Sequence, residues 1–233
     1  MTKVLITTVP FGNIDRYPLD LLEEKNISYL INPLGKKLSE DELLSLVGDC
    51  EVIVAGTEAI TDKVMAAAKN LRLISRVGIG LDSVDLLAAQ KRNIAVSYTP
   101  DAPAPAVADL TMGLMYTLLR KVHMANVQMH QGNWHRFFGR RLTECSIGII
   151  GAGRVGAQVI RNLQVLGCKA ILYYDQNVRL DSEGDGQVVF SEKDEIYKTC
   201  DIISLHVPLD MKTKNMITLD QIKLMKQDAF LIN

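Results

Sequence analysis

Three glycines and one aspartate lie at spacings that suit the binding of a dinucleotide. Gly151, Gly153 and Gly156 form the pattern G-x-G-x-x-G directly after the apolar run SIGII, and Asp175 ends the next apolar run. In this pattern the first glycine makes a tight turn and the second lets the backbone approach a pyrophosphate. The third glycine allows a helix to pack closely on the preceding strand.

The helix that follows these glycines is the expected place for the phosphates. Its first residues are Arg154 and Val155, and the free amides and dipole of a helix start favour anions. The carboxylate of Asp175 suits two ribose hydroxyls but would repel a 2′-phosphate, and no arginine immediately follows it in YYDQNV. The sequence therefore predicts NAD rather than NADP as the cofactor.

A second glycine-containing turn has the residue types of an anion site. The segment SRVGIGLDSVD places Gly78 and Gly80 at the carboxyl end of a predicted strand, the edge where open parallel sheets bind ligands. The amides of Val77, Gly78 and Ile79 could form a small anion nest, to which Arg76 would add charge. A purely structural turn before the next helix explains the spacing equally well.

The histidines, cysteines and serines of the sequence do not form a further catalytic or metal-binding motif. His206, in SLHVP, ends another predicted strand, and its position predicts a wall of the cofactor pocket rather than a general base. The sequence has no metal-ligand spacing, no G-x-S-x-G elbow and no C-x-x-C pair. The four cysteines are far apart, which is typical of reduced, buried thiols and predicts a cytoplasmic protein.

Alternating apolar and amphipathic segments must position these residues. In the first part of the chain the predicted strands are residues 3–8, 27–32, 51–56, 71–76 and 94–98, with a helix between each pair. From residue 146 a second series predicts five strands, which are residues 146–151, 169–175, 187–190, 201–207 and 229–233. Fully apolar strands that alternate with helices predict parallel sheets covered on both faces.

A proline-rich segment and a long helix separate the two series. Pro100, Pro103 and Pro105 predict the crossing between domains. The following segment, residues 106–131, is predicted as one helix with a long apolar stripe. The stripe consists of Val107, Leu110, Leu114, Leu118 and Val122, widened by Thr111, Met115 and Leu119. It either packs inside its own chain or forms a subunit interface, which would make the protein a homodimer.

Composition and charge exclude several classes of protein. The 233 residues are 48% hydrophobic and 23% charged, as in ordinary globular proteins. The chain has 27 acidic and 26 basic residues, which gives a formal net charge of −1. A protein with so little net charge has no strong electrostatic field that would attract nucleic acid or anionic lipid. The sequence has no signal peptide and no segment long enough to span a bilayer, so we expect neither nucleic-acid nor membrane partners.

Several segments together resemble the NAD-dependent D-2-hydroxyacid dehydrogenases, with the closest likeness to the D-3-phosphoglycerate dehydrogenase branch. They are, in order, RVGIGLDSVDL, VSYTP, VADLTMGLMYTLLR, GNWHR, GIIGAGRVG, YYD, SLHVPLDMKTKNMI and AFLIN. The resemblance implies a hydride transfer between NAD and C2 of a small 2-hydroxy or 2-keto acid. The implied fold class is α/β with two doubly wound parallel sheets. Residues 1–98 are expected to form a flavodoxin-like substrate domain, and residues 99–233 a Rossmann NAD domain that is incomplete at its C-terminus.

The resemblance also implies roles for individual residues. The implied cofactor positions are Gly151, Gly153, Arg154, Val155, Gly156, Asp175, His206, Val207, Pro208 and Thr213. The implied substrate positions are Arg76, Val77, Gly78, Ile79, Gly80 and Arg136. Phosphoglycerate-type members carry an arginine and a serine where this chain has Ala55, Gly56, Thr57 and Glu58. This departure argues against 3-phosphoglycerate or another phosphorylated substrate.

The end of the chain bears on catalysis. In the family, LIN is followed by an arginine that binds the substrate carboxylate, then by a glutamate and by the general acid–base histidine. The resemblance thus implies that the catalytic residues lie beyond Asn233, that the chain is truncated, and that it does not turn over 2-hydroxy acids by itself. A non-catalytic NAD-binding or interaction protein on the same fold, as in the family-like transcriptional corepressors, is the alternative.

Overall fold

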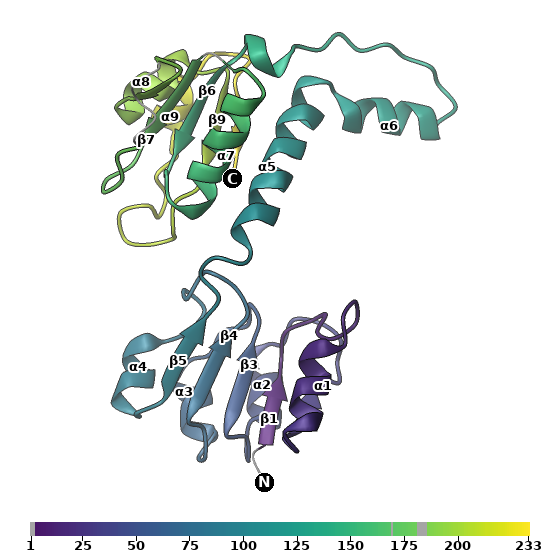
Figure 1. Ribbon diagram of the computed structural model, residues 1–233, viewed down its shortest axis with the longest axis vertical. Helices are drawn as coiled ribbons and strands as arrows, with labels where there is room; N and C mark the ends of the chain where they lie inside the picture. Colours follow the sequence, from purple (N-terminus) through teal and green to yellow (C-terminus); the bar gives the residue numbers. More distant parts are fainter. Residues whose placement is uncertain (1–2, 169, 181–185) are drawn as a thin grey trace. The chain divides into compact units, whose positions relative to one another are not determined.

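The chain folds as two units, each built on one parallel sheet. The computed structural model describes residues 3–168, 170–180 and 186–233, and the units are Met1–Pro103 and Ala104–Asn233. Helices flank both sheets (Figure 1), so the predicted α/β class with two parallel sheets is confirmed. The predicted boundary at residues 98/99 lies shortly before the division of the units. Among the described residues, no helix has the length and apolar character needed to cross a membrane.

The sheet of the first unit has the strand order β2-β1-β3-β4-β5. Its strands are β1 (Lys3–Ile6), β2 (Ser28–Ile31), β3 (Val52–Ala55), β4 (Leu73–Arg76) and β5 (Ala95–Tyr98). All neighbours pair in parallel, with Val4 opposite both Tyr29 and Val52. This is the flavodoxin-like order predicted from the sequence.

The helices of the first unit begin where the sequence supplies capping side chains. They are α1 (Tyr17–Glu24), α2 (Glu40–Leu46), α3 (Asp62–Ala67) and α4 (Leu86–Lys91). Ser39 and Glu42 form a capping box at the start of α2, and Thr61 accepts from the amide of Val64. The Asp85 carboxylate accepts from the amide of Ala88 at 2.9 Å. Each cap satisfies a backbone donor that the first turn leaves without a helical acceptor.

The strands of this sheet bury side chains on both faces. On one face Leu5 belongs to a core cluster that includes Ile53 and Ile74 and that α2, α3 and α4 cover. On the other face Val4 and Ile6 pack with Leu19 of α1. The alternation along β1 follows from the two-residue period of a strand.

The sheet of the second unit has the order β10-β9-β6-β7-β8. Its strands are β6 (Ser146–Ile150), β7 (Ala170–Tyr174), β8 (Val188–Phe190), β9 (Ile202–Leu205) and β10 (Phe230–Ile232). All pairs are parallel. Numbered within the unit, the order is 3-2-1-4-5, which matches the nucleotide-binding Rossmann arrangement.

The second unit has five α-helices among its described residues, and four of them cover the two faces of the sheet. They are α5 (Ala104–Leu119), α6 (Val122–His130), α7 (Arg154–Val165), α8 (Lys193–Thr199) and α9 (Leu219–Leu224), with a 3₁₀ turn at Leu142–Glu144. Helices α5 and α7 pack on one face, and α8 and α9 lie on the other (Figure 1). The apolar side chains of Ile147 and Ile149 face α5 and α7, whereas Ile150 packs with Ile196 of α8.

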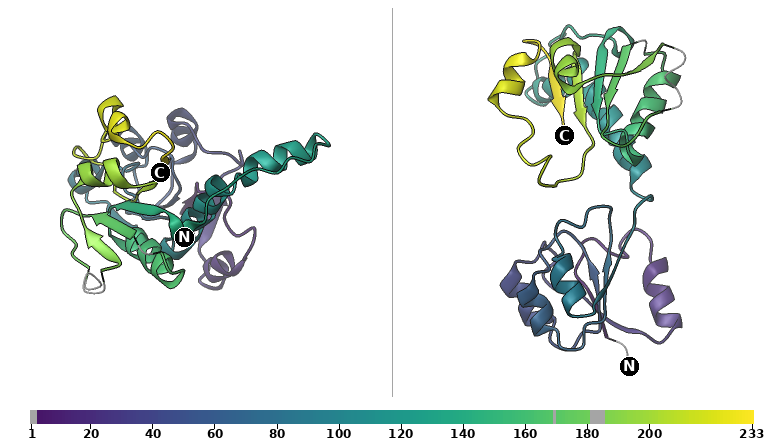
Figure 2. Two further views of the ribbon diagram at one scale, coloured as in Figure 1. Left: turned by 90° about the horizontal axis from the view of Figure 1, so that it is seen from above. Right: turned by 90° about the vertical axis from the view of Figure 1, so that its left-hand side faces the viewer.

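The single helix predicted over residues 106–131 is wrong, because the structure divides it at Lys121. This residue adopts the left-handed conformation, with φ of 52°, between α5 and α6. A left-handed residue cannot continue an α-helix, so α6 starts in a new direction and extends away from the sheet of its own unit (Figure 2). All of α6 lies within the described residues 3–168, and none of its side chains is buried.

The apolar stripe predicted on this helix is only partly the buried face. Helix α5 packs against α7 through Ala108, Met112, Met115 and Leu119. The predicted stripe residues Val107, Leu110 and Leu114 are exposed, Leu110 to 62%. The chain's own core therefore covers one side of α5 and leaves a second apolar side open.

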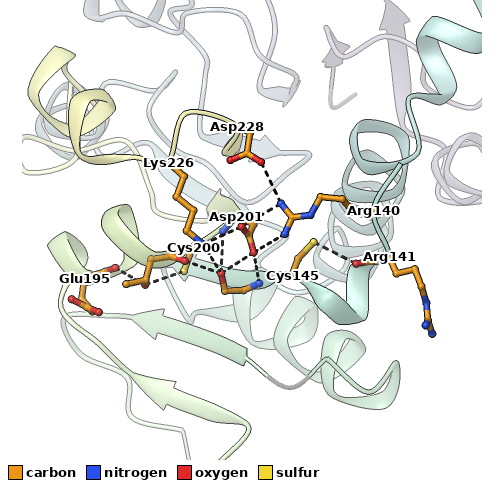
Figure 3. A network of polar contacts seen from close by, with 10 residues as sticks. Arg140, Arg141, Cys145, Glu195, Cys200, Asp201, Lys226 and Asp228 are labelled. Carbon is orange, nitrogen blue, oxygen red and sulfur yellow. Dashed lines mark hydrogen bonds and ion pairs between the residues drawn. The ribbon is translucent and has the colours of Figure 1, made fainter. Parts of the chain in front are cut away.

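A charged network fixes the amino end of the second sheet (Figure 3). Asp201 lies just before β9, and its Oδ2 accepts from the amide of Ser146 at 2.8 Å and from its hydroxyl at 2.9 Å. Oδ1 accepts from Lys226 Nζ at 3.0 Å, and Arg140 approaches Oδ2 at 3.1 Å. The side chain of Asp201 is 10% exposed, so these contacts compensate a largely buried charge. The network joins β6, β9 and the segments before β6 and β10 at the end of the sheet opposite to the glycine turn.

Candidate functional site

The predicted glycine turn connects β6 to α7 at the carboxyl edge of the second sheet. Gly151 has φ of +98°, and its amide donates to the carbonyl of Tyr174 at 2.8 Å. Gly153 precedes the first residue of α7 in an extended conformation. Among the described residues, no side chain caps the start of α7, which is the condition under which a helix start can bind an anion through its amides.

Two of the glycines are required by close packing. A Cβ on Gly156 would overlap the carbonyl oxygen of Gly151, and one on Gly151 would lie 2.5 Å from the carbonyl oxygen of His206. A Cβ on Gly153, in contrast, would have no atom of the described residues within 4 Å, so the space in front of α7 is open. The third glycine therefore holds the helix close to the turn, and the second leaves room for an approaching group.

Asp175 follows β7, and backbone amides fix its carboxylate. Oδ2 accepts from the amide of Ala152 at 2.8 Å, and Oδ1 accepts from the amides of Asn177 and Val178 at 2.8 and 3.0 Å. The bond to Ala152 ties Asp175 directly to the glycine turn. A carboxylate has about four acceptor positions, so capacity remains for a ribose hydroxyl.

A pocket of about 170 Å³ joins the ends of three strands in this unit. Of the predicted cofactor residues, its lining includes Gly151, Asp175, Val207, Pro208 and Thr213. Gly153, Arg154, Val155, Gly156 and His206 do not line it. Arg154 and Val155 lie instead in the first turn of α7, beside the turn that opens into the pocket.

His206 is half-buried and directly follows β9. Its Nε2 lies 2.9 Å from Ser204 Oγ, and burial lowers the pKa of the imidazole to about 4. The ring is therefore neutral near pH 7. Its backbone carbonyl packs against Gly151, so the residue contributes to the shape of the turn.

The loop after β9 is held in shape by Asp210 and Thr213. Asp210 Oδ1 accepts from the amides of Lys212 and Thr213 at 2.7 and 2.9 Å. The Thr213 hydroxyl accepts from the amide of Asp210 at 2.8 Å and donates to the carbonyl of Pro208 at 2.5 Å. Sequence reasoning missed Asp210, whose signal was its place at the head of a turn in LDMKT.

Sequence reasoning also missed Arg179. Its guanidinium lies 3.6 Å from the centre of the Phe190 ring and donates to the carbonyl of Asp175 at 2.9 Å. A cation thus lies close to Asp175 although no arginine immediately follows that residue. The stacking on Phe190 joins the segment after β7 to β8 and has no local sequence signal.

The predicted substrate loop lies in the first unit, after β4. The amide of Val77 donates to the carbonyl of Ala55 at 2.9 Å, and that of Gly78 donates to Thr99 Oγ1 at 2.8 Å. Gly78 has φ of +145°, and the guanidinium of Arg76 donates to the carbonyl of Val77. Two of the three amides proposed for an anion nest therefore have partners within the unit. Gly80 is exposed at the end of this loop.

Arg136 belongs to the second unit. It lies on the exposed segment between α6 and the 3₁₀ turn. The described residues contain no group of three or more histidine, cysteine, aspartate or glutamate side chains that could hold a metal ion.

The residues of the glycine turn fit a dinucleotide. The open space at Gly153, the uncapped start of α7 and the fixed carboxylate of Asp175 are the three features that a pyrophosphate and a ribose require. These groups would hold the cofactor by its phosphates and its adenosine ribose.

Comparisons with known proteins agree with this site. Residues 112–233 match the family described as D-isomer specific 2-hydroxyacid dehydrogenase, NAD binding domain. A D-3-phosphoglycerate dehydrogenase of Methanocaldococcus jannaschii is 37% identical over 200 residues, 84% of this chain and 38% of the relative. A hydroxypyruvate reductase of Thermotoga maritima is 35% identical over 202 residues, 85% of this chain and 65% of the relative. The chain therefore spans between about a third and two thirds of the length of these relatives.

A solved structure extends the likeness to both units. The D-lactate dehydrogenase of Aquifex aeolicus, complexed with NAD and lactic acid, superposes with a TM-score of 0.84 at 25% identity. The match covers 100% of this chain and 68% of the other. From the glycine turn, the fixed aspartate and the family match over residues 112–233, the chain belongs to the D-isomer specific 2-hydroxyacid dehydrogenase family through its NAD binding domain.

Proposed function

We propose that the protein is an NAD-dependent oxidoreductase that acts on a small 2-hydroxy acid or the corresponding 2-keto acid. The observation that carries this proposal is the glycine turn, which precedes the uncapped start of α7 and donates the amide of Ala152 to the carboxylate of Asp175. NAD, when bound, exchanges a hydride with C2 of the acid. The relatives named above are dehydrogenases or reductases of such acids.

The chain's own residues would bind and orient the two reactants. The amides of Arg154 and Val155 face the phosphates, and Asp175 accepts from the ribose. Val207, Pro208 and Thr213 form one wall of the pocket, whose shape Asp210 maintains. We assign the acid to residues 76–80 of the first unit. Arg136, in the second unit, remains a predicted substrate residue. His206 takes no proton near pH 7, because its pKa is about 4.

Two measurements test this function. Calorimetry should show that the 233-residue protein binds NAD. NADH absorbance with a 2-keto acid measures turnover, which is not expected of this chain by itself. The same assay on a chain extended to the length of its relatives tests the expectation that the acid–base histidine follows Asn233. Absence of NAD binding would contradict the proposal.

A non-catalytic NAD-binding module is the second candidate. It is favoured by the state of His206, the histidine nearest the cofactor pocket, which is neutral and bonded to Ser204. The extended chain separates the two candidates. NAD binding without any turnover by that chain would support the binding module.

Asp175→Asn should reduce the preference for NAD over NADP. The amide keeps an acceptor oxygen for the backbone but removes the charge that would repel a 2′-phosphate. We expect the ratio of the two affinities to fall about tenfold, measured by calorimetry with both cofactors. Glu144→Gln is the matched control and should leave the ratio unchanged, because this exposed carboxylate of the same unit pairs with Arg141 and does not line the pocket. Equal affinities of the wild-type protein for NAD and NADP would refute the assignment.

We infer that two copies associate through the open apolar side of α5. Leu110→Glu with Leu114→Glu should convert a dimer into a monomer, because both side chains are exposed and a charge there could not be buried in an apolar interface. Light scattering at micromolar concentration measures the mass. Ile14→Glu, at a residue that is 98% exposed in the first unit, should leave the mass unchanged. A wild-type monomer would contradict the inference.

We also propose a cytoplasmic location. All four cysteines are free and buried, and burial raises the pKa of Cys50 and of Cys200 to about 11. Such thiols are unreactive and are typical of a reducing compartment.

A further inference from the structure

The first unit also contains a pocket, which lies at the carboxyl ends of its strands. It has a volume of about 150 Å³, and residues 7–9, 56–58 and 76–77 line it together with Lys37. These segments follow β1, β3 and β4, so the pocket lies on the edge where parallel sheets bind ligands. Arg76 and Val77 belong both to this pocket and to the substrate loop of the proposed function.

Glu58 is the buried charge of this pocket. The residue is 2% exposed, and its Oε1 accepts from the amide of Gly56 at 2.8 Å and from the hydroxyl of Thr7. Among the described residues, Oε2 has no hydrogen-bond donor, and no lysine or arginine forms an ion pair with the carboxylate. Only Oε1 is enclosed by these donors, since Oε2 is not among the buried polar atoms that lack a partner. Oε2 therefore reaches the open space of the pocket, where it can accept a hydrogen bond from a ligand.

The backbone around Glu58 is shaped to hold this carboxylate at the pocket. A Cβ on Gly56 would lie 2.8 Å from Glu58 Oε2 and 3.0 Å from the Cα of Thr8. Thr7, 1% exposed, bonds both to Glu58 and to the carbonyl of Val54. Glycine at position 56 therefore leaves the space that the free oxygen occupies.

Hydrogen-bond donors complete the pocket. Asn32 donates to the carbonyls of Thr7 and Lys36 at 3.2 and 2.8 Å, which holds the chain around Lys37 against the end of β1. Arg76 Nε is buried and has no partner among the described residues. The pocket thus combines two cations with one acceptor, and it suits an acid that also carries a hydrogen-bond donor.

We propose that Glu58 determines substrate specificity by accepting a hydrogen bond from a hydroxyl or ammonium group on the carbon beyond C2 of the acid. This proposal rests on the proposed function. The same carboxylate excludes a phosphate from that position, because two anions would then share a site of low dielectric constant. The substrate class is therefore a small, unphosphorylated 2-hydroxy acid with a polar third carbon.

Direct binding of three acids tests the proposal. D-Glycerate, D-lactate and D-3-phosphoglycerate are titrated into the 233-residue protein and followed through the amide signal of Gly56. We expect glycerate to bind about tenfold more tightly than phosphoglycerate. In Glu58→Gln this ratio should fall about tenfold, while the affinity for lactate, which lacks the hydroxyl, changes less than about twofold. An unchanged ratio in this variant, a wild-type preference for phosphoglycerate, or binding of none of the acids would overturn the proposal.

Control variants separate folding from recognition. Glu51→Gln changes a glutamate at the other end of β3, paired with Arg72, and should leave all three affinities unchanged. Lys37→Gln removes one of the two cations that line the pocket and should weaken the binding of glycerate and of lactate alike, which tests the pocket even if Glu58→Gln unfolds. Unchanged affinities for both acids in Lys37→Gln would count against the pocket. A parallel titration with NAD separates the role of Glu58 from the proposed NAD-dependent function. If the protein binds NAD but Glu58→Gln leaves the selectivity between the acids unchanged, only the role of Glu58 is refuted.

Discussion

Gly156→Ala is expected to abolish NAD binding and to lower the free energy of unfolding by about 3 kcal/mol, the upper end of the range for overpacking. The new methyl would overlap the carbonyl oxygen of Gly151 and lie 3.3 Å from Ile149 Cγ2. Because the first of these atoms belongs to the backbone, it cannot rotate away as a side chain could. Helix α7 would have to move from the turn, and the amides at its start would no longer face the phosphates.

Gly153→Ala is the matched control for this prediction. No atom of the described residues lies within 4 Å of its Cβ position, and the residue has φ of −70°, which alanine adopts without strain. The thermal midpoint should therefore stay unchanged. The NAD affinity should still fall at least about tenfold, because the methyl occupies the space that the pyrophosphate needs.

Urea unfolding and calorimetry distinguish these outcomes. If Gly153→Ala binds NAD as tightly as the wild-type protein, the phosphates do not approach this turn. If Gly156→Ala keeps both its stability and its NAD affinity, the close contact between helix and turn is not required.

Asp201→Asn should destabilise the protein by about 3 kcal/mol, because removal of one partner of a buried ion pair leaves the remaining groups uncompensated. The substitution removes the charge that Arg140 and Lys226 share and one of the acceptors for Ser146. These bonds fix β6, β9 and the start of β10 at one end of the sheet (Figure 3). The free energy of unfolding in urea at pH 7 measures the effect.

The contribution of Asp201 should disappear in acid. Burial by itself raises the pKa of this carboxyl, but hydrogen bonds from Ser146 and Lys226 and the charge of Arg140 outweigh burial and lower the pKa from 3.8 to about 2. Since the folded pKa lies below the unfolded value, the stabilisation is complete above about pH 4 and is lost as the pH falls toward 2. The difference between wild type and Asp201→Asn should therefore shrink over this range.

An exposed ion pair provides the comparison. Asp49→Asn removes the partner of Lys3, and both side chains of that pair are more than half exposed. Exposed pairs contribute at most about 1 kcal/mol, so this variant should unfold near the wild-type midpoint. A loss in Asp201→Asn no larger than that in Asp49→Asn would show that the network does not stabilise the sheet.

The order of the strands and helices and the place of the cofactor turn could be predicted from the sequence. Runs such as VIVA and AFLI are apolar throughout, and this pattern is typical of strands buried on both faces. The helices between the strands could be predicted as well, because capping side chains such as Ser39, Thr61 and Asp85 act on amides of their own first turn. Gly151, Gly153, Gly156 and Asp175 were found for the same reason, since strand, turn and helix are adjacent in the chain.

The groups that meet across long separations are known only from the folded chain. Asp201 bonds to Ser146, Glu58 to Thr7, and Arg179 stacks on Phe190, and none of these contacts has a local pattern. The fold also places Val107, Leu110 and Leu114 outside the core of their own unit, where periodicity alone left two possibilities. Apolar periodicity records that a side chain prefers to leave water, but it does not specify the surface that covers it. That surface, and the partners of a buried charge, are set by the packing of segments that are distant in sequence.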